Sequence, residues 1–178
     1  MRIAVSGTHC SGKSTLIEAF LSVHLDYTHE PEAYDALQEN FGAEPSADDF
    51  FRQLEYQIER LKQYRLADRV IFERSPFDYV AYLQALLDLK RENADLSLAE
   101  QAMDMARSSV ELLDLIVYLP AHDAHIHVPE EEDRELRVAM DTRLEHMLNS
   151  EQVTQLVEAT GTTAQRLEAV ERALSQLK

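Results

Sequence analysis

The sequence predicts an α/β protein, with helices on both faces of a parallel sheet. Three short apolar runs, at 3–5, 69–72 and 115–119, are each typical of a buried strand. A fourth short run lies at 153–157, before Gly161. Stretches with helical spacing separate these runs, and strands that alternate with helices pair in parallel through right-handed crossovers.

Apolar residues three and four positions apart predict the helices in order along the chain. These stripes span 16–23, 50–66, 79–87 and 167–174. Ser97 and Glu100 predict a capping box that opens a further helix reaching about Leu113, and Thr162 with Gln165 predicts the cap of the last helix. Helices therefore alternate with the predicted strands.

The length of 178 residues suits a single domain over 1–178. Seventeen Lys and Arg against 33 Asp and Glu give a net charge of −16, which argues against nucleic acid and acidic membrane surfaces as partners. The lone Cys10 cannot form an internal disulfide, and no apolar run reaches the length of a membrane span. These features predict a cytoplasmic protein.

The strongest motif is Gly7-Thr8-His9-Cys10-Ser11-Gly12-Lys13-Ser14, which matches the phosphate-binding pattern G-x-x-x-x-G-K-[ST]. It follows the first predicted strand and precedes the first predicted helix, as this loop requires. Two of the four glycines in the chain fall in the motif, where backbone N–H groups must turn inward around phosphate oxygens. The motif predicts the P-loop NTPase fold.

The loop from Gly7 to Thr15 is expected to bind ATP. Lys13 would reach the β- and γ-phosphates, the Ser14 hydroxyl would ligate Mg²⁺, and Thr15 would meet the nucleotide. His9 and Cys10 occupy variable positions of the pattern. The N-K-x-D element of guanine-specific proteins is absent and the chain is short for a motor protein, so a small-molecule kinase is favoured.

The loop and three further segments resemble the P-loop small-molecule kinases, in particular the deoxynucleoside kinases and the nicotinamide riboside kinase-like ATP-binding proteins. These segments are Glu30-Pro31, 72–83 and 134–148. The resemblance implies a sheet of about five strands and a helical lid over about 121–148. It also implies that Glu30, or the competing Glu32, accepts the proton of the sugar hydroxyl that is phosphorylated.

By the same resemblance, Glu73-Arg74-Ser75 matches a D/E-R-S element at a strand end. There the carboxylate holds Mg²⁺ or its waters, and the arginine bridges the donor and acceptor phosphates. An ordinary ion pair between Glu73 and Arg74 is the structural alternative.

The resemblance also implies lid arginines that neutralise the transferred group, and Arg134, Arg137 and Arg143 occupy that region. A solvated, salt-bridged helix face is the alternative for Arg134 and Arg137. The neighbouring His122, His125 and His127 have a spacing that transition metals can use, but exposed loop histidines more often hydrate than ligate.

Together these features predict an ATP- and Mg²⁺-dependent kinase for a small hydroxyl acceptor that is a nucleoside or nucleoside-like. Two alternatives stay open: an ATP-binding regulatory module that acts on a protein partner, and a nucleoside monophosphate kinase. Thymidylate kinases, which the chain also resembles, place an arginine before the E-P pair, whereas His29 stands here and favours a neutral acceptor. A homodimer is also left open.

Overall fold

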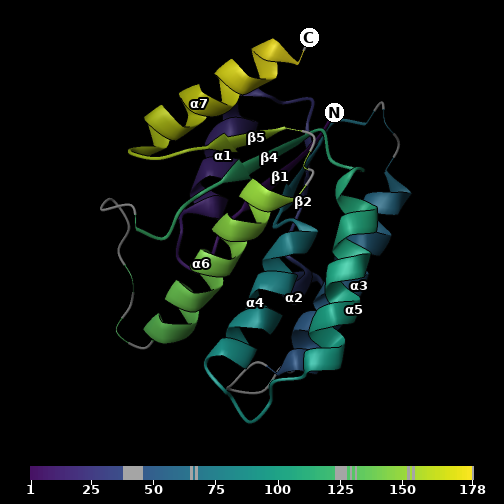
Figure 1. Cartoon of the computed structure of the whole chain (residues 1–178). Coiled ribbons are helices and arrows are strands. Elements are labelled where there is room, and N and C mark those ends of the chain that lie inside the picture. Colours follow the sequence, from purple (N-terminus) through teal and green to yellow (C-terminus); the bar gives the residue numbers. More distant parts are fainter. Residues whose placement is uncertain are drawn as a thin grey trace.

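The computed structural model of the chain describes residues 1–37, 46–64, 66, 68–122, 128, 130, 132–151, 153 and 155–177. Within these ranges, five strands and seven helices follow one another along the chain (Figure 1). The strands are β1 (Arg2–Ser6), β2 (Thr28–Glu30), β3 (Val70–Glu73), β4 (Leu115–Tyr118) and β5 (Leu156–Glu158). The helices are α1 (Lys13–Val23), α2 (Ala33–Leu37), α3 (Ala47–Gln63), α4 (Pro76–Asp88), α5 (Leu96–Val110), α6 (Arg134–Ser150) and α7 (Thr163–Gln176).

The strands form one parallel sheet in the order β2-β3-β1-β4-β5. This confirms the predicted α/β class with a parallel sheet of about five strands. The first strand of the chain lies at the centre, so the segment after Ser6 leaves the sheet between the carboxyl ends of β3 and β4. Ligands bind at such a position in open α/β sheets.

Helices cover both faces of the sheet. Figure 1 shows α1 and α7 on one face and the layer from α3 to α6 on the other. Two separate apolar clusters correspond to these faces: Val5, Leu16 and Val170 belong to the first, and Phe72 and Leu144 to the second. The three central strands β1, β3 and β4 are buried on both sides, as their continuous apolar runs predict, whereas the edge strands β2 and β5 are partly exposed.

The alternation of side chains along the strands decides which helix each strand-end residue faces. Glu30 pairs in register with Phe72, so both side chains point toward the α3 face. Glu73 pairs with Val5 and points toward the α1 face. The two glutamates at the ends of adjacent strands therefore lie on opposite faces of the sheet.

Some predicted helix positions are wrong. Leu66 lies beyond α3, because the chain turns extended at Tyr64, and its side chain is 74% exposed. Val23 lies in the last turn of α1, as its spacing predicts, but its side chain is exposed. Ser97 does not cap α5: the carboxylate of Asp95 accepts the N–H of Leu98 at 3.0 Å and begins the helix two residues earlier.

The end of the chain also differs in detail from the prediction. The helix predicted to reach about Leu113 ends at Val110, and β5 spans Leu156–Glu158 rather than 153–157 because its pairing with β4 starts at Leu156. The capping box of Thr162 and Gln165 is present as predicted. Among the described residues, no helix is both long and apolar enough to cross a membrane.

Candidate functional site

The phosphate-binding motif forms the turn between β1 and α1, at the carboxyl end of the central strand. Gly7 and Gly12 have φ angles of 150° and 85°, which L side chains rarely adopt. A Cβ atom at Gly7 would lie 2.7 Å from the carbonyl oxygen of Leu119, and one at Gly12 would lie 2.7 Å from a guanidinium nitrogen of Arg166. The turn therefore requires glycine at both positions.

The other loop residues differ in their burial. Thr8 and Ser11 are buried, and Cys10 is partly buried with a positive φ of 51°. Ser14 and Thr15, in the first turn of α1, are exposed. The loop is therefore buried at Thr8 and open to solvent at Ser14 and Thr15, where a ligand can enter.

Lys13 lies at the first position of α1 and is 5% exposed. Its ammonium group donates a hydrogen bond to the carbonyl oxygen of Thr8 at 3.1 Å. Burial, followed by the positive charge of Arg74, lowers the pKa of Lys13 to about 8. An anion bound in the loop would offset both effects, since it favours the charged form of the amine.

Ser14 and Glu73 connect α1 with the end of β3. The Ser14 hydroxyl donates to Oε1 of Glu73 at 3.0 Å. A hydroxyl and a carboxylate are hard oxygen donors of the kind that Mg²⁺ prefers, and Mg²⁺ keeps several waters, so one or two such side chains suffice. The residues present therefore fit the predicted magnesium ion.

The Arg74 guanidinium is 1% exposed and links the loop to the acidic residue after β2. Its Nε donates to Oε1 of Glu32 at 2.5 Å, and Nη1 donates to the carbonyl oxygen of Gly7 at 3.0 Å. The same Nη1 lies 3.6 Å from Oδ1 of Asp78. Nη2 is buried without a hydrogen-bond partner among the described residues, so one donor of Arg74 remains for a ligand.

The backbone of Arg74 adopts the left-handed region, with φ of 75°. A non-glycine residue in this region costs on the order of 1–3 kcal/mol. Gln57, which is completely buried in α3, donates from Nε2 to the carbonyl oxygen of Arg74 at 2.8 Å. Gln57 therefore fixes the conformation that directs the guanidinium toward the loop.

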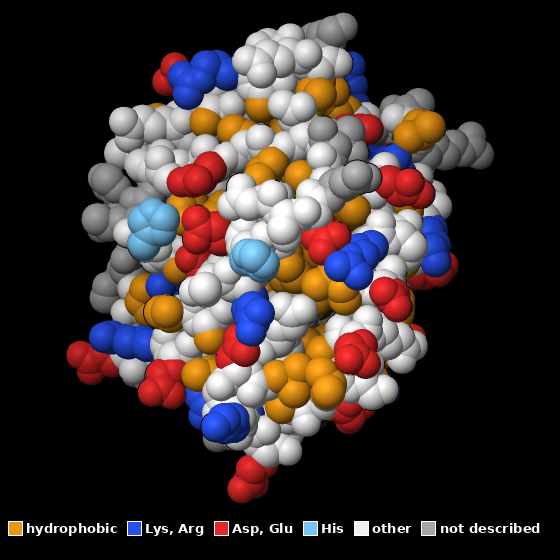
Figure 2. Space-filling model, viewed as in Figure 1, with side chains coloured by type: hydrophobic (Ala, Val, Ile, Leu, Met, Phe, Trp, Pro, Cys, Tyr) orange, Lys and Arg blue, Asp and Glu red, His pale blue; other side chains and the backbone are white. Residues whose placement is uncertain are grey.

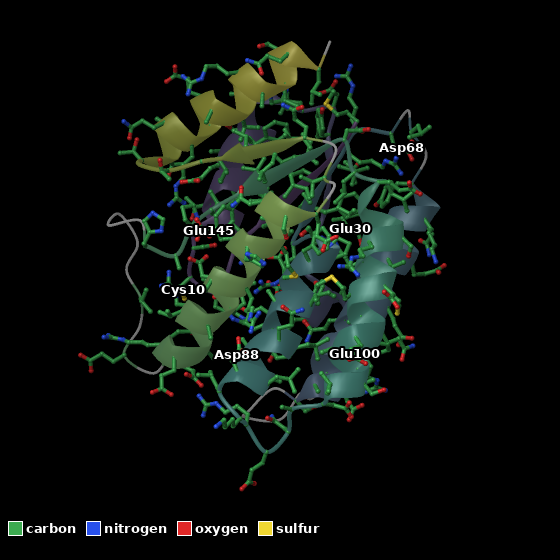
Figure 3. The ribbon with its side chains drawn as sticks, in the orientation of Figure 1. Cys10, Glu30, Asp68, Asp88, Glu100 and Glu145 are labelled. Atoms are coloured by element: carbon green, nitrogen blue, oxygen red, sulfur yellow. The ribbon has the colours of Figure 1, made fainter. Side chains whose placement is uncertain are left out.

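The two candidate bases have different neighbours. Glu32 contacts Arg74, and although burial raises its pKa, the charges of Arg74 and Lys13 outweigh burial and hold the pKa at about 2. Glu30 instead accepts two hydrogen bonds from Arg60, at 2.6 and 2.8 Å, and one from Tyr64 at 2.8 Å. In the view of Figure 3, the labels of Glu30 and Cys10 lie well apart, to either side of α6. The structure brings Glu32, not Glu30, to the loop.

A small cavity of about 40 Å³ opens beside Glu32 and Arg74. The described residues that line it are His9, Glu32, Tyr34, Phe50, Gln53, Arg74, Tyr79 and Tyr82. Among these lining residues Arg74 carries the permanent positive charge, and it already forms an ion pair with Glu32. The walls are otherwise aromatic and amide side chains, which suit a flat neutral molecule better than a second phosphate.

The three arginines of α6 lie in different places. Arg137 is 8% exposed and donates to the carbonyl oxygens of His9 and Ala121, each at 3.1 Å. Arg134 is exposed at the start of α6 and lines, with Arg137, a second cavity of about 370 Å³. Arg143 forms a bidentate salt bridge with Asp88 on the surface, with N···O distances of 2.6 and 2.5 Å. The structure brings Arg137 to the loop and leaves Arg143 away from it.

The remainder of α6 belongs to the helical layer rather than to a separate flap. Met140, Leu144 and Met147 of α6 are buried in the apolar cluster that also contains residues of α4. Of the predicted lid, residues 123–127, 129 and 131 lie outside the described residues.

The histidine cluster lies mostly there as well: His122 is exposed, and His125 and His127 are not described. The part of the chain that the structure describes contains no group of three or more His, Cys, Asp or Glu side chains that could hold a metal.

Two further residues support the loop through contacts that the sequence does not predict. Asp78 accepts the backbone N–H of Gly7 at 2.8 Å and also closes a capping box with Ser75. Arg166 donates to the carbonyl oxygen of Ser11 at 2.8 Å. The pattern Ser75-x-x-Asp78 signals the cap, but nothing local signals the contacts with the loop, since they join segments more than 70 residues apart.

The parallel sheet and the glycine-containing turn at the end of its central strand define the P-loop NTPase fold. The sequence profile of a family described as an AAA domain matches residues 2–166, and the chain belongs to this family. No curated protein sequence matches the chain.

Solved structures with the same fold include several kinases. NadR in complex with NR superposes with a TM-score of 0.70 at 17% identity over 98% of this chain, and this chain spans 51% of NadR. Deoxyadenosine kinase from M. mycoides with bound dATP gives 0.64 at 18% identity over 98% of this chain and 99% of that chain. Thymidylate kinase from Candida albicans gives 0.62 at 15% identity over 98% and 91%. The predicted resemblance to P-loop kinases is confirmed for the fold.

Proposed function

We propose that the protein is an ATP- and Mg²⁺-dependent kinase that phosphorylates a hydroxyl group of a nucleoside or nucleoside-like molecule. The observation that carries the proposal is the Arg74 guanidinium, which bonds the phosphate loop at Gly7 and the acidic residue Glu32 at once. It therefore joins a donor site to a carboxylate beside a cavity. The likeness in fold to deoxyadenosine kinase and NadR supports the same reading.

In the proposed reaction, the acceptor hydroxyl oxygen attacks the γ-phosphorus of ATP, the bond to the β-γ bridging oxygen breaks, and ADP leaves. The hydroxyl proton passes to the carboxylate of Glu32. A pKa of about 2 makes Glu32 a weak base, which suffices because the transition state is loose and the proton moves late. Lys13, Arg74 and Arg137 stabilise the negative charge on the transferred group.

Ser14 and Glu73 would hold Mg²⁺, which neutralises charge on the phosphates when it is bound. Glu30 serves as a structural acid on the α3 face in this assignment, since Arg60 and Tyr64 occupy its carboxylate.

The acceptor would enter the cavity beside Glu32. Ligand pockets usually measure about 300–1,000 Å³, so the walls must move apart to admit a nucleoside. A neutral acceptor is favoured over a nucleoside monophosphate because Arg74 already pairs with Glu32 and the exposed His29 is absent from the cavity lining. On the face shown in Figure 2, acidic and basic side chains of the described residues are interspersed, without a large basic patch of the kind that binds nucleic acid.

ADP release in the presence of Mg²⁺, measured across matched nucleosides and nucleoside monophosphates, tests the proposal. We expect turnover with at least one neutral nucleoside and a loss of at least about 100-fold in Lys13→Ala. Turnover with monophosphates alone would favour the monophosphate kinase, and equal turnover by Lys13→Ala would contradict the assigned donor site.

A further inference from the structure

We propose that the hydroxyl group of Tyr82 couples nucleotide binding in the phosphate loop to the shape of the acceptor cavity, with His9 as its partner in the loop. The inference rests on the proposed function, because it takes the loop as the ATP site and the adjoining cavity as the acceptor site. It gives a positioning role to a loop residue whose position in the motif is variable.

The polar end of Tyr82 lies on the loop. Its hydroxyl oxygen accepts the backbone N–H of His9 at 3.1 Å and lies 2.5 Å from Nδ1 of the same residue. The hydroxyl is also 3.5 Å from Oγ1 of Thr8. A neutral imidazole can accept at Nδ1, and burial, followed by the charge of Arg74, keeps the pKa of His9 low, at about 3. The Tyr82 hydroxyl therefore holds both the main chain and the side chain of His9.

The ring of Tyr82 forms a wall of the cavity. It stacks on Phe50 with a centroid distance of 4.5 Å and an interplanar angle of 3°, and the Arg74 guanidinium carbon lies 5.3 Å from the ring centroid. Tyr82 and Phe50 both line the cavity and are buried. One rigid side chain thus touches the loop with its hydroxyl and the acceptor side with its ring.

The His9 N–H already donates to Tyr82, so a phosphate in the loop would engage the neighbouring backbone N–H groups, which form such cradles. Arg137 holds the carbonyl oxygen of the same residue, so both sides of the His9 peptide are restrained from other helices. Close-packed interiors pass a displacement on to their neighbours rather than absorbing it. A shift at His9 on nucleotide binding therefore moves the Tyr82 ring and, through it, Phe50.

The chain provides a matched control one turn earlier in α4. Tyr79 is equally buried and lines the same cavity. Its hydroxyl makes no hydrogen bond to the loop residues that the structure describes. Tyr79→Phe and Tyr82→Phe remove the same atom from the same helix, but only the second removes a contact with the loop.

The test combines calorimetric titration of AMP-PNP and Mg²⁺ with the ring signals of Phe50, followed by NMR in phenylalanine-labelled protein. In the wild type, AMP-PNP is expected to shift the Phe50 signals. In Tyr82→Phe we expect this shift to disappear and the Kd for AMP-PNP to rise about 3- to 10-fold, the effect of a lost hydrogen bond. Tyr79→Phe should keep both the shift and the wild-type Kd.

A Phe50 response that persists in Tyr82→Phe, or that is lost equally in Tyr79→Phe, would overturn the proposal. Binding of AMP-PNP without any Phe50 response in the wild type would overturn the coupling alone, whereas no binding at all would overturn the donor site and the coupling together. His9→Ala removes the Nδ1 acceptor but keeps the backbone N–H that donates to Tyr82, so, as the second variant if Tyr82→Phe does not fold, it is expected to weaken the Phe50 response. An unaltered Phe50 response in His9→Ala would contradict the proposal.

Discussion

Glu30 and Glu32 are two residues apart, but their carboxylates have different partners because only Glu30 belongs to β2. As a strand residue, Glu30 must follow the pleat toward α3, where Arg60 and Tyr64 saturate its oxygens. Glu32 lies past the end of the strand and is free of that alternation, so its side chain reaches Arg74. Their chemical roles follow from this difference in position.

Glu32→Gln is expected to lower kcat by about 10²- to 10⁴-fold, because the amide cannot accept the acceptor's proton. Glu30→Gln should keep kcat within about tenfold of the wild type but lower the free energy of unfolding by about 1–3 kcal/mol, since it weakens the hydrogen bonds from Arg60 and Tyr64. Steady-state kinetics and urea unfolding of both variants provide the check. The reverse pattern, with turnover lost only in Glu30→Gln, would refute the choice of base.

The pKa of Glu32 also makes stability depend on pH. Folding lowers this pKa from 4.5 to about 2, so the stabilisation is present above pH 4.5 and declines as the pH falls toward 2. The difference in unfolding free energy between wild type and Glu32→Gln should therefore shrink by about 2 kcal/mol from pH 7 to pH 3. Urea titrations at both pH values measure it, and a pH-independent difference would show that the pKa of Glu32 is not lowered.

Much of the donor loop could be predicted from sequence, because its glycines, Lys13 and Ser14 are contiguous and follow a strand. The choice between Glu30 and Glu32 could not, since it depends on where β2 ends and on Arg60, which lies 30 residues away. The role of Gln57 could not be predicted for the same reason. Nothing in the local sequence indicates that this helical amide donates a hydrogen bond to the backbone carbonyl of Arg74, just after β3.

At the scale of elements, α6 contributes Arg137 to the loop, whereas Arg134 and Arg143 lie at the surface. Arg137 reaches the carbonyl oxygens of His9 and Ala121, while Arg143, less than two turns later, pairs with Asp88 of α4. The carboxylate of Asp141, also in α6, accepts hydrogen bonds from the Tyr118 hydroxyl and from the N–H of Ala121, each at 3.0 Å, and so fixes the chain just after β4. α6 therefore holds the chain after β4 close to the phosphate loop.

These two arginines give a paired test of the predicted lid. Arg137→Gln is expected to lower kcat by about 10³-fold or more, as for other arginines that stabilise a transferring phosphoryl group. Arg143→Gln should change kcat less than about twofold, because Arg143 pairs with Asp88 away from the loop and an exposed pair contributes mainly a small amount to stability. Initial rates at saturating ATP decide between them. Equal effects of the two substitutions would mean that Arg137 only packs.

The errors of element prediction have a common physical cause. Apolar spacing continues to Leu66 although the backbone leaves the helix at Tyr64, and the helix after β3 and α4 is capped by Asp95 rather than by Ser97, although both residue types cap well. Local patterns give the existence of an element more reliably than its ends, because end positions depend on competing caps and on contacts from elsewhere in the chain.

At the scale of the whole molecule, the sheet order makes the site. The order β2-β3-β1-β4-β5 places the loop of β1 beside the ends of β3 and β4, so Ser14 meets Glu73 and Gly7 meets Arg74 although 59 and 67 residues separate these pairs. The alternation of strands and helices indicates this class of sheet, but no local pattern specifies its order. The sheet in this order buries one apolar cluster on each of its faces.

The fate of the γ-phosphoryl group of ATP tests the central claim most directly. Protein, Mg²⁺, γ-labelled ATP and a panel of neutral nucleosides are incubated together, and the label is traced in phosphorylated nucleoside and in free phosphate. We expect label in a nucleoside phosphate, and expect Lys13→Ala and Glu32→Gln to abolish it. Label found solely in free phosphate, or unchanged transfer by both variants, would contradict a kinase built on Arg74 and Glu32.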